Sequence, residues 1–458
     1  MRILILTILI ALSSTTSGQT LSLSVAEAQA KALETNRNAQ ISELEIEKAK
    51  RVVKETMAIG LPQIQGEGSF QNFLDIATQV LPDFISPSVY GVLVDEGLLP
   101  DGSGGNPGLI PAQFGTEYSF SAGVSLNQMI FNGSYIIGLK AAKSYVDMSR
   151  LQKEKSDIDV KEEVARSYHT ALMAEESARV VDESTLTLES MLVEIQALYT
   201  EGFVEEQDVE QMQLTLNRLK IQQQNALRQM TLTKQLLNFQ IGLPLETTVI
   251  LSDDVSSLTT DPSLEALLGI APQTETHPEM LIIDQGILLQ NLKVKEMKSR
   301  YLPTLNGFFN YQQQAQRNEF NFFDSTQDWF PSTVWGISLQ VPIFTSGMRS
   351  NQVKQLAIDL EEFELQKELA TDALTLSAFQ SKSDYLFARE NYAMEQENME
   401  IAKRIRDKTL IKYQEGLASS FELNEIENQY LQTESRRIQA SMSLLDALTN
   451  LKKAYNRL

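Results

Sequence analysis

The sequence predicts a mixed α+β membrane protein made of two tandem repeats, each in the order helix, strand, strand, long helix, helix. Three observations predict this fold class. Short motifs return in the same order at a long, nearly constant offset, and such a period marks one architectural unit used twice. Long stretches without proline have helical composition. Four segments alternate between polar and apolar residues, which is typical of strands with one apolar face.

The tandem repeat is carried by three pairs of motifs. They are Gly60–Ile64 and Tyr301–Leu305, Met129–Gly133 and Pro342–Gly347, and Tyr199–Val209 and Tyr413–Leu423. The offset changes only between the first and second pairs, so the first copy holds about 28 extra residues there. Insertions settle in loops. We therefore expect a first repeat at 19–242, an inter-repeat linker or equatorial region at 243–276, and a second repeat at 277–458.

The N-terminus has the pattern of a secretory signal peptide over residues 1–18. Arg2 supplies the positive charge, Ile3–Leu12 the apolar stretch, and Ser13–Gly18 the small residues of a cleavage region. About 10 apolar residues are too few to cross a bilayer, which needs about 20. The chain has no cysteine, so neither a disulfide nor an acylated N-terminal anchor is expected. The mature chain is expected to be exported.

Composition predicts the helices of each repeat. Proline-free stretches predict long helices at 134–200 and 348–413, followed by shorter ones at 205–241 and 421–457. At 1.5 Å per residue, a helix of this length measures roughly 100 Å. Further helices are expected over about 24–59, which opens with a capping box at Ser24 and Glu27, and over 279–300. In each repeat the two shorter helices together approach the length of the long one, which suggests that they stack end to end beside it.

The helices that follow the glycine turns carry a heptad repeat. Seven of nine seam positions are apolar in each copy, which predicts coiled-coil hairpins with a left-handed supercoil. An ordinary amphipathic helix is the alternative interpretation. The seam positions are Val209, Met212, Leu216, Leu219, Gln223, Ala226, Met230, Thr233 and Leu237, and then Leu423, Ile426, Tyr430, Thr433, Arg437, Ala440, Leu444, Ala447 and Leu451.

Strands are predicted at about 61–72, 114–131, 302–312 and 333–344, where polar and apolar residues alternate. About 10 residues is also the length of a tilted transmembrane strand. Half-buried strands of soluble sheets have the same pattern. Two features favour a membrane location. The helices are too long for a compact core, and aromatic residues lie toward the loop ends of the strands, as in an interfacial belt. These aromatic residues are Tyr118, Tyr311, Trp329 and Trp335. The segments 72–113 and 313–332 are expected to be long exposed hairpin loops.

Four strands are too few to close a barrel, and an open sheet edge is not tolerated in lipid. If the strands lie in a membrane, the chain must therefore oligomerise. Three copies supply twelve strands, within the range of outer-membrane barrels. The predicted assembly is a trimeric 12-stranded transmembrane β-barrel, continued by a long periplasmic α-helical coiled-coil barrel.

Charge and residue content exclude several function classes. A net charge of −21 argues against nucleic acid as a partner. The two histidines, His169 and His277, lie in different repeats and are expected to be ordinary helix residues, because a metal site needs convergent donors. No nucleophile–base pair or phosphate loop is present in the sequence. No catalytic residue, metal or cofactor is therefore predicted.

A series of short motifs runs through the mature chain in a fixed, partly duplicated order. They are Leu23–Ala28 with Ala32–Asn36, Leu61-Pro62, Leu126–Gly133, Tyr199–Gly202 with Asp208-Val209, Ile241–Pro244, Leu302-Pro303, Val341–Phe344 and Tyr413–Gly416. In these motifs the chain resembles the TolC-like outer-membrane efflux proteins over essentially its whole mature length. The resemblance implies a homotrimeric channel in outer-membrane lipid, which meets an inner-membrane pump of the RND or ABC type through a periplasmic adaptor protein.

The resemblance also implies roles for residues at the helix-hairpin tips. Glu422 and Glu425 match the family's periplasmic constriction, although a solvated helix face is the alternative for them. Asp208 and Tyr413 match contacts that hold the tip closed. Ala418 stands where some members have an arginine partner, which departs from that pattern. The tip turns, which would also meet the adaptor, fall on Gly202, Phe203, Gly416 and Leu417.

Two other functions fit the sequence. Within the same family, the chain could be the outer-membrane conduit of a type I protein secretion system. In another class, it could be a soluble periplasmic coiled-coil scaffold or adaptor whose strands pack on a protein partner instead of lipid.

Overall fold

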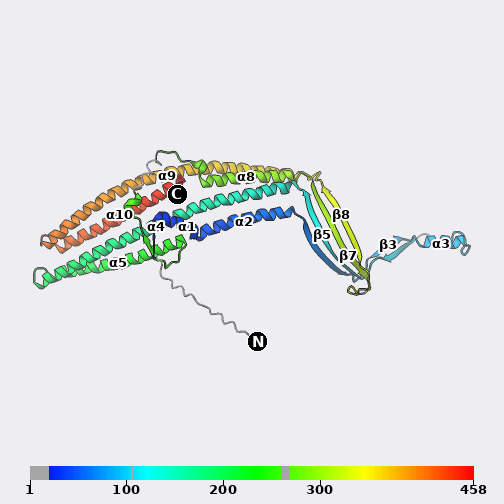
Figure 1. The fold of residues 1–458 in the computed structure, drawn as a ribbon, viewed down its shortest axis with the longest axis horizontal. Helices are drawn as coiled ribbons and strands as arrows, with labels where there is room; N and C mark the ends of the chain where they lie inside the picture. The colour runs from blue at the N-terminus through cyan, green and yellow to red at the C-terminus, as the bar shows by residue number, and fades with distance from the viewer. Residues whose placement is uncertain (1–19, 105–107, 260–267) are drawn as a thin grey trace, which may run out of the picture. The chain divides into compact units, whose positions relative to one another are not determined.

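The computed structural model describes residues 20–104, 108–259 and 268–458, so the predicted signal peptide lies outside the described residues. The chain divides into two compact units (Figure 1). The helical unit comprises the described residues up to Arg51, together with Lys143–Asn291 and Ala357–Leu458. The sheet unit comprises Val52–Ala142 and Leu292–Leu356.

The helices of the two repeats lie where composition predicts them. The long helices are α4 (Gly133–Thr200) and α9 (Met348–Gln414). The shorter helices that follow them are α5 (Glu206–Ile241) and α10 (Ser420–Ala454), and α8 (Pro278–Ser299) precedes the strands of the second repeat. None of the helices in the described part of the chain combines the length and apolar character needed to cross a membrane.

Burial along α5 and α10 confirms the heptad seam. Every predicted seam position is buried or half-buried, whereas most other positions in the first two-thirds of α5 are exposed. A second buried stripe runs along α10 with a spacing of seven residues. It is formed by Ser420, Glu427, Glu434, Ser441 and Leu448. The second stripe was not predicted, because four of its five members are polar.

The helix expected over 24–59 is divided into α1 (Val25–Thr35) and α2 (Arg37–Ile59). The Ser24 capping box is present, as predicted. The break lies at Asn36, whose side-chain amide donates to the carbonyl of Gln240 at 2.6 Å and whose side-chain oxygen accepts from the Asn38 amide at 2.7 Å. The Thr35 hydroxyl also donates to Ile241 O at 2.7 Å. Contacts with the end of α5 thus interrupt a segment that has neither proline nor glycine.

The described parts of the inter-repeat region contain regular secondary structure, which its composition did not suggest. β6 (Val249–Leu251) pairs in parallel with β1 (Leu21–Leu23), and α6 (Val255–Thr259) and the 3₁₀ turn η1 (Thr274–Thr276) follow. The Tyr168 hydroxyl joins this small sheet to α4, because it donates to Leu23 O at 2.9 Å and accepts from the Asp253 amide at 3.2 Å.

The sheet unit holds one four-stranded antiparallel sheet in the order β2-β5-β7-β8. Its strands are β2 (Gln63–Asn72), β5 (Tyr118–Phe131), β7 (Thr304–Arg317) and β8 (Phe330–Gln340). β7 runs five residues beyond its predicted end, and β8 ends before Val341–Phe344, which were predicted as strand. Pro342 lacks the amide hydrogen that a strand ladder uses. The pairing of β5 with β7 joins the two repeats into one sheet.

The strand register confirms that the sheet has one apolar and one polar face. Polar positions pair with polar positions across β2 and β5, as in Gln65 with Ser125 and Ser69 with Ser121, whose hydroxyls lie 2.8 Å apart. Apolar positions pair on the other face, as in Leu305 with Leu339 and Phe309 with Trp335. Four apolar side chains are exceptions on the polar face: Met129, Phe308, Phe330 and Val334.

The two predicted loops are partly structured, which corrects the sequence interpretation. Residues 72–113 contain the hairpin β3 (Thr78–Pro82) and β4 (Leu109–Gln113), with α3 (Ser86–Asp95) between them. In the shorter loop, Phe320 and Phe322 make edge-to-face contacts with Phe70, and Trp329 makes one with Phe120. Tyr118 and Trp329 therefore lie at the loop end as expected. Trp335 and Tyr311, in contrast, pair within the body of the sheet.

Candidate functional site at the hairpin tips

Both helix hairpins turn through the same backbone motif. Gly202 and Gly416 have positive φ angles of 78° and 70°, a region that glycine enters at no steric cost. In each turn the glycine amide bonds the carbonyl three residues back, and the next amide bonds the carbonyl five residues back. These last bonds are Phe203 N to Leu198 O at 2.9 Å and Leu417 N to Lys412 O at 2.7 Å. This is a Schellman motif, so the duplicated sequence gives duplicated geometry.

Side chains cap the helices that leave the two turns. Glu205 precedes α5 and forms a capping box with Asp208, which accepts from the Glu205 amide at 3.4 Å. Ser419 precedes α10 and accepts from the Glu422 amide at 3.2 Å. Such caps satisfy amide hydrogens that have no partner within the helix.

The first turns of α5 and α10 are joined by a hydrogen bond from the Ser420 hydroxyl to Asp208 Oδ1. Tyr413 lies close by, half-buried at the end of α9. Burial raises the pKa of Tyr413 to about 12, and the charges of Asp208 and Glu194 act in the same direction. Among the described residues, the Asp208 partner across the hairpins is therefore Ser420, which the sequence analysis did not select.

An apolar core lies directly above the tips and holds the hairpins together. It contains Leu188, Met191 and Ile195 of α4, Met212, Leu216 and Leu219 of α5, and Leu423 of α10, with Tyr413 and Leu410 of α9 packed against it. Residues of all four helices meet in this cluster.

Ion pairs of two largely buried arginines extend the contact above this core. Arg406 of α9 bonds Glu427 of α10 at 2.7 Å, and its guanidinium lies 4.5 Å from the ring centroid of Tyr430. Arg437 of α10 bonds Glu434 at 3.0 Å and Glu176 of α4 at 2.9 Å. Glu427 and Glu434 belong to the second buried stripe of α10. Their spacing of seven residues was the signal in the sequence that could have identified them.

The predicted constriction residues Glu422 and Glu425 are both exposed on the first two turns of α10. Their carboxylates make no ion pair within the described part of the chain. The structure of a single chain brings them to the same end as Gly416 and Asp208.

The tips also expose large apolar side chains. Phe203 and Leu417 stand at matching positions after the two glycines, and each is 77% exposed. Phe421 is 70% exposed beside them. Isolated exposed apolar residues are common, but a group of three at the end of two hairpins is typical of a protein contact.

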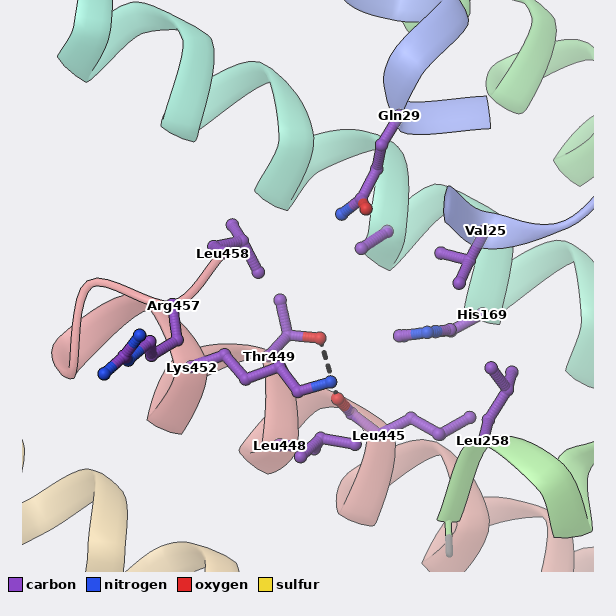
Figure 2. Close-up of a pocket in the computed structure, with 11 residues that line it drawn as sticks. Val25, Gln29, His169, Leu258, Leu445, Leu448, Thr449, Lys452, Arg457 and Leu458 are labelled. Atoms are coloured by element: carbon purple, nitrogen blue, oxygen red, sulfur yellow. Dashed lines mark hydrogen bonds between the residues drawn. The ribbon is translucent and has the colours of Figure 1, made fainter. Parts of the chain in front are cut away.

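A concavity lies in the helical unit, between α1, α4, α6 and α10 (Figure 2). It has a volume of about 150 Å³ and is lined on one side by Val25, His169 and Leu258 and on the other by Thr449 and Lys452. Burial lowers the pKa of His169 to about 4, so its imidazole is neutral at pH 7. In the described part of the chain, no three histidine, aspartate or glutamate side chains are placed to share a metal ion.

His277 is not a helix residue, contrary to the prediction. It lies just before α8, and its Nδ1 accepts from the Glu279 amide at 3.3 Å. Burial lowers the pKa of His277 as well.

Comparison with known proteins relates the second repeat to one family. Residues 285–457 match the model described as outer membrane efflux protein. No curated protein sequence matches the chain. The family is one of channel proteins rather than enzymes, which agrees with the absence of a predicted catalytic site.

Solved structures show the same fold over nearly the whole chain. The outer membrane channel CmeC of Campylobacter jejuni matches with a TM-score of 0.67 at 15% identity, over 94% of this chain and 85% of that one. CusC, described in terms of folding and transmembrane channel formation, matches with 0.66 at 14%, over 97% and 95%. The open state of the Neisseria gonorrhoeae MtrE outer membrane channel matches with 0.63 at 15%, over 94% and 88%.

Proposed function

We propose that three copies of this chain form the outer-membrane channel of a tripartite export system, a passive conduit that receives substrates from an inner-membrane pump through a periplasmic adaptor. The observation that carries the proposal is the four-stranded sheet, which has an apolar face exposed in the single chain and two free edges. In a soluble single chain, nothing would cover this apolar face or pair with these strand edges.

The free edges of the sheet favour a closed ring of copies. β2 pairs only with β5, and β8 pairs only with β7, so each has one unpaired edge among the described strands. Because every pairing in the sheet is antiparallel, β8 runs antiparallel to β2. The β8 of one copy can therefore join the β2 of the next and continue the same pattern. Three copies in cyclic symmetry give twelve strands, an even number as in bacterial outer-membrane barrels.

The exposed apolar face of the sheet favours lipid as its surroundings. Trp335 is 75% exposed and Ile64 is 68% exposed, and Ile337 and Leu339 are similarly open. At about 25 cal/mol per Å² of apolar surface, leaving such side chains in water is unfavourable. In a membrane, lipid hydrocarbon covers these apolar side chains instead of water.

The helical unit carries a matching signal on α9. Eight exposed apolar side chains recur at intervals of four, seven or eleven residues, which places them along one line of the helix. They are Ile358, Leu365, Leu369, Leu376, Phe387, Met394, Ile401 and Ile405. A shorter line of the same kind runs along α5 through Leu214, Ile221, Leu232 and Phe239. We call these the α9 stripe and the α5 stripe. Coiled-coil contact between the stripes of neighbouring copies would cover both.

The tips would form the periplasmic entrance of this channel. Glu422 and Glu425 would each contribute three carboxylates to a ring that attracts cations. Asp208, Tyr413 and Ser420 would hold the hairpins in the closed arrangement. Phe203, Leu417 and Phe421 would meet the adaptor. These roles rest on the family resemblance and on the exposure and contacts of the side chains.

Cysteine cross-linking tests the arrangement directly, because the natural chain has no cysteine. Phe387→Cys is combined with Leu232→Cys, Met394→Cys with Ile221→Cys, and Ile401→Cys with Leu214→Cys, because the two members of each pair lie at similar distances along the helices from the glycine turns. The membranes are treated with a short bifunctional thiol reagent. At least one pair should give covalent dimers and trimers. The control pair combines Met394→Cys with Leu227→Cys, an exposed position of α5 outside the stripe, and should give none. Equal cross-linking in the control, or none in the whole series, would contradict the proposal.

Two alternatives remain distinct from this function. A conduit for type I protein secretion would share the trimer but would export a polypeptide, so cross-linking does not separate it. Export assays with a co-expressed pump would. A soluble periplasmic scaffold would be released without detergent and would give no stripe-specific trimer.

A further inference from the structure

The polar face of the sheet contains a single charged residue. The four strands of the sheet include only two, Glu67 and Arg317. Arg317 lies at the loop end, buried, and donates to the carbonyls of Asn321 and Asp328. Glu67 instead lies on the polar face, among serine, asparagine and glutamine side chains. The face is therefore almost neutral, with one carboxylate per chain.

Glu67 lies in a hollow that the sheet forms over this polar face. The hollow has a volume of about 870 Å³, and its lining includes Ser69, Ser121, Asn310 and Ser332. A second hollow of about 570 Å³ continues along the same face beside Gln63 and Asn306. The sheet thus curves around its polar side, as expected if that side faces a lumen.

Glycines give the carboxylate open surroundings. Gly66 and Gly68 flank Glu67 in β2, and Gly123 pairs with it in β5. A Cβ on Gly123 would lie 2.6 Å from Tyr311 O, so a larger residue is not accommodated there without a shift. Across the described part of the chain, no hydrogen bond or ion pair engages the Glu67 side chain. Its charge is left for mobile ions.

The position of Glu67 along the strand matters as much as its face. It is the fifth of ten residues in β2 and pairs across the middle of the sheet with Gly123, Gln312 and Ser332 in turn. A carboxylate at mid-depth is costly if it faces hydrocarbon, whereas in a water-filled lumen it keeps its hydration. In a trimer, three copies of Glu67 would lie at one level of the barrel.

We propose that Glu67 forms a charge-selecting ring inside the membrane section of the channel, separate from the glutamates at the tips. This inference rests on the proposed function, because it requires the polar face to line a pore. The ring attracts cations and positively charged substrates and disfavours anions, and no basic residue of the sheet's polar face opposes it. Screening limits its reach to about 10 Å at 0.1 M salt and about 3 Å at 1 M.

Reversal potentials in planar bilayers test the ring. The full chain carrying Glu422→Gln and Glu425→Gln serves as the background, so that the tips do not mask the effect. In a KCl gradient centred near 0.1 M, Glu67→Gln should lower the K⁺ to Cl⁻ permeability ratio about threefold, and the difference should shrink near 1 M. Glu67→Lys should favour Cl⁻. Glu246→Gln, an exposed carboxylate in the linker, should leave the ratio unchanged.

The possible outcomes separate this inference from the function on which it rests. Trimeric pores that conduct normally, with the same ratio in Glu67→Gln and in the background, would overturn the ring and leave the channel in place. A wild-type protein that never conducts would overturn both. If Glu67→Gln does not assemble, Glu67→Ser, which matches the neighbouring serines, carries the same expectation.

Discussion

At the scale of single residues, the structure adds Ser420 to the tip residues that the family resemblance implied. Asp208 and Tyr413 are close, but the hydroxyl that bonds Asp208 belongs to Ser420. Ser420 was not selected because one serine near a helix start is ordinary in a sequence. Its role as a partner of Asp208 becomes apparent only when α5 and α10 are seen to lie side by side. The buried Arg406–Glu427 pair was missed for the same reason, since a charged residue in a helix is normally read as exposed.

The tip glutamates give the first prediction. Replacing Glu422 and Glu425 with glutamine should reduce the cation preference of the channel, because six carboxylates would leave the proposed entrance. Bilayer conductance measures the effect. Glu415→Gln, an exposed carboxylate on the other side of the glycine turn, is the matched control. Unchanged ion selectivity in the double variant would remove both residues from the constriction.

His169 gives a prediction on pH. Its pKa is about 4 in the folded chain because of burial, against 6.5 ordinarily. Between these values the unfolded chain binds the proton and the folded chain does not. Stability should therefore fall as the pH falls from 6.5 to 4, by about 3 kcal/mol from this group.

A variant isolates this contribution from other acid effects. In His169→Leu the loss of stability between pH 6.5 and 4 should be smaller than in the natural chain. Thermal unfolding followed by circular dichroism at several pH values measures the difference in Tm. If the two proteins lose the same number of degrees over that pH range, the buried neutral imidazole is not the cause.

At the scale of elements, local sequence determines most of what the structure shows. The heptad of α5 was visible because each seam position repeats a simple spacing, and proline-free composition located the long helices to within about two residues. The division between α1 and α2 was not visible, because it depends on Asn36 and Thr35 bonding the end of α5. Gly242 allows that approach, since a Cβ there would lie 2.3 Å from Thr35 O. The order within 72–113 was missed because α3 has few of the usual helix formers.

The glycine turns give the prediction at this scale. Gly202→Val and Gly416→Val should each add about 1–2 kcal/mol of backbone strain at a tip, because the two glycines have positive φ angles. Nothing lies within 4 Å of either Cβ position, so crowding does not contribute. We expect impaired export with trimers intact. Tolerance to a pump substrate, together with native gels, provides the measurement.

Gly138→Val serves as the control for these variants. Gly138 also has open space around its Cβ position, but it has no positive φ. It should retain export. Normal export by the two tip variants would argue against the tip as a working part of the channel.

At the scale of the whole molecule, a single chain has two kinds of surface without a partner among the described residues. They are the unpaired edges of the sheet and the exposed apolar side chains of the α9 and α5 stripes. The repeat explains both, because a duplicated unit that ends in an unpaired strand and an uncovered helix can add further copies of itself. The need for several copies could be inferred from four strands alone. The helix faces that would meet could not be inferred, because the α9 stripe departs from a plain heptad and includes a step of eleven residues.

A charge in the α9 stripe should prevent assembly. Leu369 is 71% exposed in the single chain, so Leu369→Asp should cost the isolated chain little. It should weaken the trimer by a few kcal/mol for each buried carboxylate. Native gels of detergent extracts give the trimer fraction. Gln366→Asp, an exposed position off the stripe, should assemble normally, and equal behaviour of the two variants would contradict the stripe as an interface.

The native mass of the natural protein, extracted from outer-membrane fractions in detergent, tests the central claim most directly. With a chain mass of 51.4 kDa before any processing, the account predicts a protein mass close to three chains. It also predicts that the protein is not released without detergent. A monomer or dimer that dissolves without detergent would mean that the apolar face of the sheet does not contact lipid. The proposed channel function would then be wrong, and the soluble periplasmic scaffold would be the better interpretation.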